Sequence, residues 1–450
     1  MLMDTAIADL KRQLRGTLLA PADDGYDTLR KVWNGMIDKR PALIAKCAAP
    51  ADAAACVNFA REHGVALSVR GGGHNYAGKA VCEGGLMLDF SLMKGIEVDP
   101  KRRSVRAQAG LKLGEFDRKT QEYGLATTLG VATTTGIAGL TLGGGYGWLA
   151  GKYGLACDNI TRAQIVTADG NILECSAGEN ADLFWGLRGA GANFGVVTEL
   201  EYTLYPVSSV LGGPIFHPLG RAAFAFYEEL ARSAPDELTV LGSAMTGPGG
   251  VPAFATVVCY CGPTAEGEKL LRPLRTYATP IADLIQLRPY VEMQSLFDAT
   301  FPPGRRYYNK AHNVSAFGDG LVDTTLRYAK KLPGPDSSIA FQQLHGLAAR
   351  VAVSDTAFPH RYEHHVAWVD PVGDDPADDG RMISWARECW EALGPFADRA
   401  VYVNALDDAL EEGERPVREA YGANYERLRD LKRKYDPANL FRQNSNIKPS

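Results

Sequence analysis

Several features that would mark a membrane, secreted or nucleotide-hydrolysing protein are missing from this sequence. No window approaches the roughly 18 uncharged apolar residues of a membrane-spanning helix. The start, Met1-Leu2-Met3-Asp4-Thr5-Ala6, lacks the basic segment and apolar core of a secretory signal. No Gly-x-x-x-x-Gly-Lys-[Ser/Thr] motif is present, which disfavours a nucleotide triphosphatase. We therefore expect a cytoplasmic protein that contacts no membrane.

An excess of positive charge is also missing. The 450 residues carry a net charge of −5, and 46% of them are hydrophobic and 22% charged, as in soluble globular proteins. This balance gives no reason to expect nucleic acid as a partner, so a small molecule is the default. The length exceeds what one hydrophobic core usually supports, so we expect two or three structural units, in a monomer or homodimer.

Paired metal ligands are absent as well. The eight cysteines are scattered and none forms a Cys-x-x-Cys pair, which favours reduced thiols. Cys259 and Cys261 share one face of an expected strand, but no histidine or second cysteine pair is nearby, so buried packing is favoured over metal binding. His364 and His365 are adjacent and point to opposite faces of a strand, which favours one core and one surface histidine. We expect no metal.

Short strands and helices alternate over the first 205 residues. Asp169-Gly170 predicts a tight hairpin, because it supplies residues that accept positive φ. We expect strands at 65–69, 86–88, 95–98, 104–109, 164–167, 172–175 and 194–205, and helices at 112–123 and 181–188. This mixture predicts an α+β fold rather than a doubly wound sheet.

The texture of the chain changes near Val207. Longer segments appear at 222–231 and 253–260, and they predict a second domain that extends to about residue 395. Apolar residues at spacings of three and four then predict one amphipathic helix over 415–435, which Asp436-Pro437 ends.

Three consecutive glycines, Gly71, Gly72 and Gly73, lead into His74 at the end of a short apolar strand. Glycine accepts positive φ, so such a turn can bring several backbone N–H groups against one anion. An imidazole at that place can act as a base, a ligand or a covalent attachment point. The alternative is a plain glycine-rich turn with an ordinary surface histidine.

Two further glycine clusters follow. Residues 136–147 hold too many glycines for stable secondary structure, which close approach to a ligand or to another segment would explain. A large flat ligand would fit between this cluster and the first. Residues 189–195 read Gly-x-Gly-x-x-x-Gly and precede a strand, so we reject a Rossmann dinucleotide motif.

Five ordered motifs occur along the chain, at residues 70–75, 139–147, 152–159, 184–198 and 435–447. Together they resemble the berberine-bridge-enzyme-like branch of FAD-linked oxidases, and in particular its bacterial members, over nearly the whole chain. The resemblance implies a PCMH-type (vanillyl-alcohol-oxidase) FAD-binding domain from residues 1–206, with the segment 396–450 returning to it. Residues 207–395 would form a separate α+β substrate domain, an antiparallel sheet covered by helices.

The resemblance also implies roles for individual residues. His74 would bond covalently to the flavin, Val197 would contact the adenine end, and Asn444 and Asn446 would close the domain. A simple helix-terminating turn is the alternative for these tail asparagines. The full set expected at the cofactor is Arg70, Gly71, Gly72, Gly73, His74, Asn75, Gly78, Thr134, Gly136, Gly139, Gly143, Gly144, Tyr146, Val197, Tyr402, Asn404, Asn444 and Asn446.

Many relatives carry a second covalent link through a cysteine, and here Ala132 occupies its place. Alanine cannot bond the flavin, so the resemblance implies attachment of FAD through His74 alone. Cys157 lies in a neighbouring motif, where we expect structural packing rather than a thioether. Thr135 stands where oxygen-reactive members carry valine, which it matches in shape, so the resemblance favours an oxidase.

Tyr402-Val403-Asn404 matches the family's Tyr-x-Asn motif, in which the tyrosine is the base in several members. A phenol has a pKa of about 10, so we expect nearby cations or the flavin to lower it. The alternative is a residue that only orients substrate. Tyr307 and Lys310 resemble residues near the substrate in relatives. Gln342 and His345 face opposite sides of an expected strand, so either is a candidate for the cleft.

The expected activity is removal of hydride from an alcohol, sugar or amine carbon by FAD, with O₂ reduced to H₂O₂. A dehydrogenase with another electron acceptor and a non-catalytic flavin- or ligand-binding protein are the alternatives.

Overall fold

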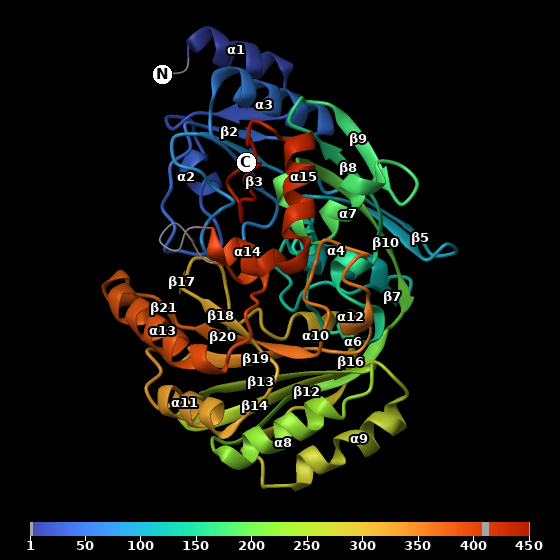
Figure 1. Ribbon diagram of the computed structural model, residues 1–450, viewed down its shortest axis with the longest axis vertical. Helices are drawn as coiled ribbons and strands as arrows, with labels where there is room; N and C mark the ends of the chain where they lie inside the picture. Colours follow the sequence, from blue (N-terminus) through green and yellow to red (C-terminus); the bar gives the residue numbers. More distant parts are fainter. Residues whose placement is uncertain (1–2, 407–413, 450) are drawn as a thin grey trace.

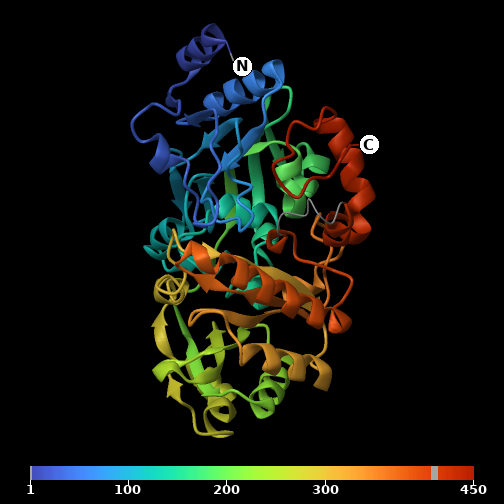
Figure 2. The ribbon, with the colours of Figure 1, turned by 90° about the vertical axis from the view of Figure 1, so that its left-hand side faces the viewer.

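A computed structural model describes residues 3–406 and 414–449 of the chain. Figure 1 shows two units stacked along the long axis. The N-terminal part of the chain, in blue to green, forms the upper unit, and the middle part forms the lower unit around a broad sheet. The C-terminal helices, in red, lie against the upper unit, as Figure 2 also shows.

The upper unit contains two sheets. The first has the order β1-β2-β4-β3, and β4 runs parallel to both β2 and β3. Its strands are β1 (Thr17–Leu19), β2 (Leu43–Lys46), β3 (Leu67–Arg70) and β4 (Leu86–Asp89), and the helix α3 (Pro50–His63) connects β2 to β3. The first glycine loop therefore begins where a parallel strand, β3, ends.

The second sheet is antiparallel and has the order β5-β6-β10-β8-β9. The predicted hairpin at Asp169-Gly170 is confirmed: it joins β8 to β9, and Gly170 has a φ of 84°. The strands are β5 (Ile96–Asp99), β6 (Ser104–Gln108), β8 (Ile160–Val166), β9 (Ile172–Ser176) and β10 (Val196–Thr203).

Short helices and a small ladder complete the upper unit. They are α1 (Asp4–Gln13), α2 (Tyr26–Leu29), α4 (Leu113–Gln121), α5 (Ile137–Leu142), α6 (Ala150–Tyr153) and α7 (Ala181–Ala190), with β7 (Leu125–Ala126) paired to β11 (Tyr205–Pro206). The expectation that residues 136–147 lack regular structure is wrong for α5. Ile137 and Leu142 are buried there, and Gly136 and Gly143 only flank the helix, so apolar packing outweighs the low helix propensity of Gly139.

An eight-stranded sheet forms the lower unit, in the order β15-β12-β14-β13-β19-β20-β18, with β16 also paired to β12. All of its strand pairs are antiparallel. The strands are β12 (Ser209–Pro218), β13 (Leu238–Thr246), β14 (Pro252–Tyr260), β15 (Ala282–Asp283), β16 (Gln286–Pro289), β18 (Lys310–Val314), β19 (Ser338–Leu344) and β20 (His364–Asp370).

One face of this sheet is covered by four helices, α8 (Arg221–Arg232), α9 (Thr264–Thr276), α11 (Asp319–Ala329) and α13 (Asp379–Leu393). Side chains alternate along a strand, so Phe341 packs with the helices while its neighbours Ala340 and Gln342 turn to the opposite face. That face is turned toward the upper unit. Around it lie α10 (Tyr290–Gln294), α12 (Leu347–Arg350) and the pair β17 (Arg306–Tyr307) and β21 (Val372–Gly373).

The prediction of one helix over 415–435 is wrong. The segment forms α14 (Arg415–Tyr421) and α15 (Tyr425–Tyr435), separated by a turn of 3-10 helix at Gly422–Asn424. Gly422 has a φ of 44°, which ends the first helix. Leu428 and Leu431 then bury the apolar side of α15 in the core of the upper unit.

All eight thiols are free, as predicted, and Cys259 is buried, but Cys261 is only half-buried. The histidine prediction is wrong. His364 and His365 are both buried, because each face of β20 is covered. Residues 3–406 and 414–449 contain no cluster of three or more potential metal-binding side chains. Within the same ranges no helix is both long and apolar enough to cross a bilayer.

Candidate functional site

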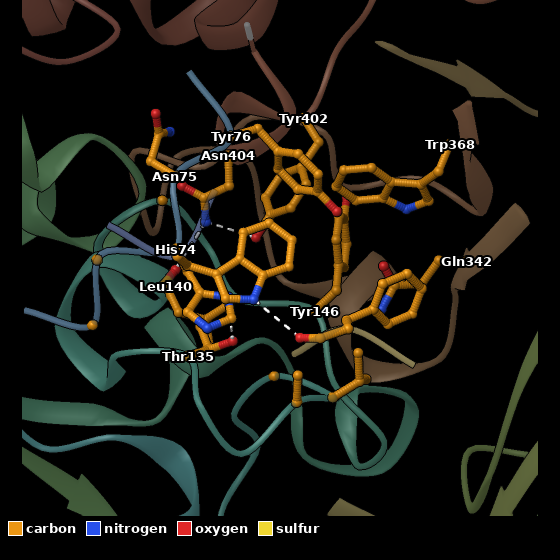
Figure 3. A pocket seen from close by; sticks show the side chains of 18 of the residues that line it. His74, Asn75, Tyr76, Thr135, Leu140, Tyr146, Gln342, Trp368, Tyr402 and Asn404 are labelled. Atoms are coloured by element: carbon orange, nitrogen blue, oxygen red, sulfur yellow. Dashed lines mark hydrogen bonds between the residues drawn. The ribbon is translucent and has the colours of Figure 1, made fainter. Parts of the chain in front are cut away.

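A cavity of about 660 Å³ lies between the upper unit and the open face of the large sheet. Its upper wall comes from three parts of the chain. They are the first glycine loop (residues 71–75), a segment within 130–143 that includes part of the second glycine cluster, and the C-terminal segment 443–445. Its lower wall comes from β12, β13, β14, β19 and β20. Figure 3 shows side chains from both units converging on this space. Segments far apart in the sequence therefore form one site.

The glycines of the upper wall have two different uses. A Cβ on Gly72 would collide with the backbone nitrogen of Gly136, so these two glycines let the loops touch backbone to backbone. Gly73 has a φ of 71°, which disfavours other residues. A Cβ on Gly139 would meet no protein atom within 4 Å, although Gly139 lines the cavity. The wall is therefore bare where a flat ligand would lie against it.

His74 stands at the centre of the upper wall. Its Nε2 is 2.8 Å from Oγ1 of Thr134, and its Nδ1 is 3.4 Å from Oγ1 of Thr135. The ring stacks on Trp33, with centroids 4.7 Å apart. Burial, with a smaller contribution from the charge of Lys112, lowers the pKa of His74 to about 3. This imidazole is therefore neutral near pH 7 and is not an ordinary surface histidine.

The position of the second covalent link is also clear. Ala132 lines the cavity, whereas Cys157 does not. Cys157 is fully buried in a cluster with Tyr146 and Phe358, and burial raises the pKa of its thiol. Its sulfur lies 3.6 Å from Oδ1 of Asp158. These contacts are those of a packing residue.

Tyr402 is enclosed where the two units meet. Its Oη accepts hydrogen bonds from the backbone N–H of Gly145 at 3.1 Å and from Nδ2 of Asn404 at 2.8 Å. Burial raises the pKa of Tyr402 to about 12, and these two donors only partly offset the rise. No arginine or lysine of the described residues is among the main causes of this shift, so of the two groups expected to lower the pKa, a cation or the flavin, the flavin stays the prediction.

A second tyrosine, Tyr146, lies beside Tyr402, with ring centroids 4.4 Å apart. Its Oη is 3.2 Å from Nε2 of His364, whose Nδ1 is 2.7 Å from the carbonyl oxygen of Tyr362. A carbonyl only accepts, so Nδ1 carries the proton and Nε2 accepts from Tyr146. Burial lowers the pKa of His364 to about 4, which keeps it neutral.

The C-terminal segment 443–445 also lines the cavity. Nδ2 of Asn444 donates to the carbonyl of Ala192 at 2.6 Å. The Oδ1 atoms of Asn444 and Asn446 are buried and accept no hydrogen bond from the described residues. Buried acceptors are rarely left unsatisfied, and Asn444 lines the cavity, so its Oδ1 suits a donor group of a bound molecule. Nζ of Lys79, a cavity residue that sequence reasoning missed, lies 3.2 Å from Oγ of Ser445.

Six residues expected at the cofactor do not line the cavity. Arg70 pairs instead with the buried carboxylate of Asp89 and donates to the carbonyl oxygens of Leu29 and Lys31. Gly78 ends a turn that begins at Asn75, and Thr134 lies behind His74. Gly144 packs on Phe358, and Val197 is buried in the core of the upper unit. The sixth residue is Asn446.

Two of the three expected substrate residues are also placed elsewhere. Ala311 pairs with Trp368, which lines the cavity, and neighbouring side chains of a strand point to opposite faces. Lys310 therefore lies on the helix-covered face and does not line the cavity. Its Nζ lies 4.7 Å from the ring centroid of Trp390. Tyr307 is buried behind Trp33, on which it stacks at 3.7 Å.

The third expected substrate residue, Gln342, does line the cavity, whereas His345 packs against Gly151. Sequence reasoning missed several cavity residues, among them Trp33, Tyr76, Trp368 and Asp370. Trp368 and Asp370 are two residues apart on one strand, so both point to the same face, but the sequence does not show which face of that strand lines the cavity.

Comparison with known proteins identifies the class to which this arrangement belongs. Residues 41–176 match the family described as FAD binding domain, and residues 401–448 match the family described as berberine and berberine like. The chain is thus an FAD-linked oxidoreductase.

Two relatives narrow the class further. An (R)-6-hydroxynicotine oxidase of Paenarthrobacter nicotinovorans is 31% identical over 460 residues and covers 97% of both chains. An FAD-linked oxidoreductase of Dictyostelium discoideum is 31% identical over 446 residues, which cover 97% of this chain and 95% of its own. The chain therefore belongs to the berberine-bridge-enzyme-like family.

Solved structures agree with this assignment. The crystal structure of 6-hydroxy-D-nicotine oxidase from Arthrobacter nicotinovorans has a TM-score of 0.88 at 29% identity and covers 97% of this chain and 98% of its own. A berberine-bridge-enzyme-like protein of Physcomitrella patens, at 22% identity, has a TM-score of 0.89 and covers 99% of both chains, which shows the shared fold. The expected PCMH-type α+β fold is confirmed.

Proposed function

We propose that this enzyme is an oxidase that carries FAD through a single covalent bond to His74, removes hydride from an alcohol, sugar or amine carbon, and reduces O₂ to H₂O₂. The observation that carries the proposal is the state of His74. Its imidazole is neutral, faces the cavity between both glycine segments, and is held by Thr134. A neutral imidazole has the lone pair that bond formation requires.

The residues present fit such a cofactor. Gly71, Gly72 and Gly73 leave the first loop without side chains, and Gly139 leaves the wall open beside it. The orphaned Oδ1 of Asn444, on the C-terminal segment, would accept a hydrogen bond from the ligand. When bound, FAD would supply the hydride acceptor and the site of reoxidation by O₂. Ala132 offers no second bond.

The geometry of His74 indicates which ring nitrogen is used. In the proposed arrangement Nε2–H donates to Thr134 at 2.8 Å, and this leaves the lone pair on Nδ1. The contact of Nδ1 with Thr135 is longer, at 3.4 Å, so Nδ1 is the less engaged nitrogen. Thr134 thus fixes the tautomer that bond formation requires.

Tyr402 is our proposed proton acceptor. Two hydrogen-bond donors, from Gly145 and Asn404, already point at its Oη, and they stabilise the phenolate better than the phenol. The high pKa of about 12 means that Tyr402 carries its proton in the resting protein near pH 7. We propose that ligand binding supplies the remaining stabilisation, that the phenol then releases its proton to solvent, and that the resulting phenolate takes the substrate proton as hydride leaves.

Oxygen is our proposed electron acceptor, and the support for it is Thr135. Its side chain lines the cavity next to His74 and has the size of valine. The test measures peroxide release against dye reduction, with the purified protein and a panel of alkaloids, oligosaccharides, monolignols and polyketides. Peroxide formed at a rate near that of flavin reduction supports the oxidase. Fast dye reduction without peroxide selects the dehydrogenase, and no flavin reduction by any substrate favours a non-catalytic protein.

A further inference from the structure

Asp370 is a carboxylate of the cavity wall for which the chemistry above has no use. It ends β20 and lines the cavity, and its backbone pairs with Ser338 on the next strand. Its Oδ1 is enclosed and has no hydrogen-bond partner within the described residues. An unsatisfied buried carboxylate oxygen is costly, and native structures retain one chiefly where function requires it.

No cationic side chain within residues 3–406 and 414–449 compensates this carboxylate. Burial raises the pKa of Asp370 to about 7, and no arginine or lysine among the described residues opposes the rise. Arg305 instead pairs with Asp336 at 2.8 Å and with Asp374 at 2.7 Å. The nearby carboxylate also contributes to the raised pKa of Tyr76, which burial mainly causes. Near pH 7 Asp370 is therefore neutralised either by a proton or by a cation from outside the chain.

The surroundings of Asp370 are aromatic. Trp368 precedes it by two residues on the same face of β20, and Tyr76 lines the cavity close by. Trp33 stands edge-on to Tyr76, with ring centroids 5.3 Å apart. Aromatic faces next to a carboxylate attract cations, because the ring quadrupole and the charge act in the same direction.

The rest of the lower wall distinguishes between substrate types. Much of it is apolar, with Leu241, Met245, Val257 and Ala340 pointing into the cavity. A polyhydroxylated substrate needs a donor or acceptor for each hydroxyl, and the polar side chains of this wall, such as Ser243, Ser338 and Gln342, are outnumbered by apolar ones. A largely apolar molecule with one positive charge matches both the wall and the carboxylate.

We propose that Asp370, with the aromatic side chains of Tyr76 and Trp368, binds a cationic nitrogen of the substrate, so that the enzyme acts on a largely apolar amine rather than on a sugar. The assignment rests on the proposed function, since it names the substrate of that same cavity. Asp370 binds and orients the substrate. It takes no part in the transfer of hydride.

The test compares two isosteric probes that differ in charge, 3-hydroxyphenyltrimethylammonium and 3-tert-butylphenol, by isothermal titration of the purified flavoprotein. We expect the wild-type enzyme to bind the cation about tenfold more tightly than the neutral isostere. Asp370→Asn keeps the shape of the side chain and removes its charge, so we expect it to abolish this preference.

Asp336→Asn is the matched control. Asp336 also lines the cavity, but it is 40% exposed at its side chain and is paired with Arg305. A preference kept in Asp336→Asn and lost in Asp370→Asn supports direct contact rather than a general negative potential. Equal binding of both probes by the wild type, or a preference kept in Asp370→Asn, overturns the inference.

Binding of these probes requires neither turnover nor a covalent flavin, so this result is separable from the proposed activity. An enzyme that releases peroxide with sugars but with no amine overturns the inference and leaves the oxidase proposal standing. An enzyme that prefers the cationic probe but reduces no electron acceptor supports the inference and overturns the oxidase proposal.

Discussion

Replacing Thr134 with valine removes one hydroxyl and keeps the volume of the side chain. That hydroxyl lies 2.8 Å from Nε2 of His74, and in our account it holds the imidazole in the tautomer that leaves Nδ1 able to form a bond. A hydrogen bond of this type has a net value of about 1 kcal/mol, which corresponds to about a fivefold slower attachment of FAD. Thr134→Ser keeps the hydroxyl, so we expect it to attach FAD at nearly the wild-type rate.

The assay adds FAD to flavin-depleted protein and follows the flavin retained in the acid-precipitated pellet over time. Thr133→Val is the matched control, because the Thr133 hydroxyl faces Asp298 rather than His74. If Thr134→Val attaches FAD as fast as the wild type, or if Thr133→Val is slowed equally, the role assigned to Thr134 is refuted.

Three further predictions concern the base, the C-terminal segment and the contact between the units. Tyr402→Phe removes the proposed proton acceptor, so we expect turnover to fall by about 10²- to 10⁴-fold while FAD stays bound, and a loss below tenfold in steady-state rates would contradict this. Asp436→Asn leaves the buried ammonium of Lys432, 2.7 Å away, without its countercharge, and denaturant unfolding is expected to show a loss of about 3–5 kcal/mol. Burial raises the pKa of Asp117 from 3.8 to about 7, although a hydrogen bond from Gln294 opposes the rise. As pH increases, Asp117 loses its proton in the unfolded chain before it does so in the folded protein. The contribution of Asp117 to stability therefore falls between these two pH values. The melting temperature of Asp117→Asn, relative to that of the wild type, should therefore increase from about pH 4 to pH 7 and stay constant above pH 7. A difference in melting temperature that does not change with pH would rule this out.

Elements with strong local patterns were predictable from the sequence. The hairpin at Asp169-Gly170 depends only on residues that accept positive φ, and the structure has it there. The break between α14 and α15 was not predictable, since the apolar spacing continues through Gly422. Tertiary contacts decide that break: Nδ2 of Asn424 donates to the carbonyl oxygens of Val353 and Ala357, which lie far away in the sequence.

The upper wall of the site was more predictable than the lower one. Glycine loops and His74 are contiguous in the sequence, so their chemistry can be inferred locally. The lower wall depends on which face of each strand is open, and the register between strands sets that. The alternation of side chains along β18 places Lys310 on the face away from the cavity, and the same alternation along β20 places Asp370 on the face that lines it.

The single covalent bond through His74 is the central claim, and acid precipitation of the purified protein tests it most directly. We predict that yellow flavin stays with the wild-type pellet, that it also stays in Cys157→Ala, and that it passes into the supernatant in His74→Ala. Flavin released from the wild-type protein, or retained in His74→Ala, would contradict the account.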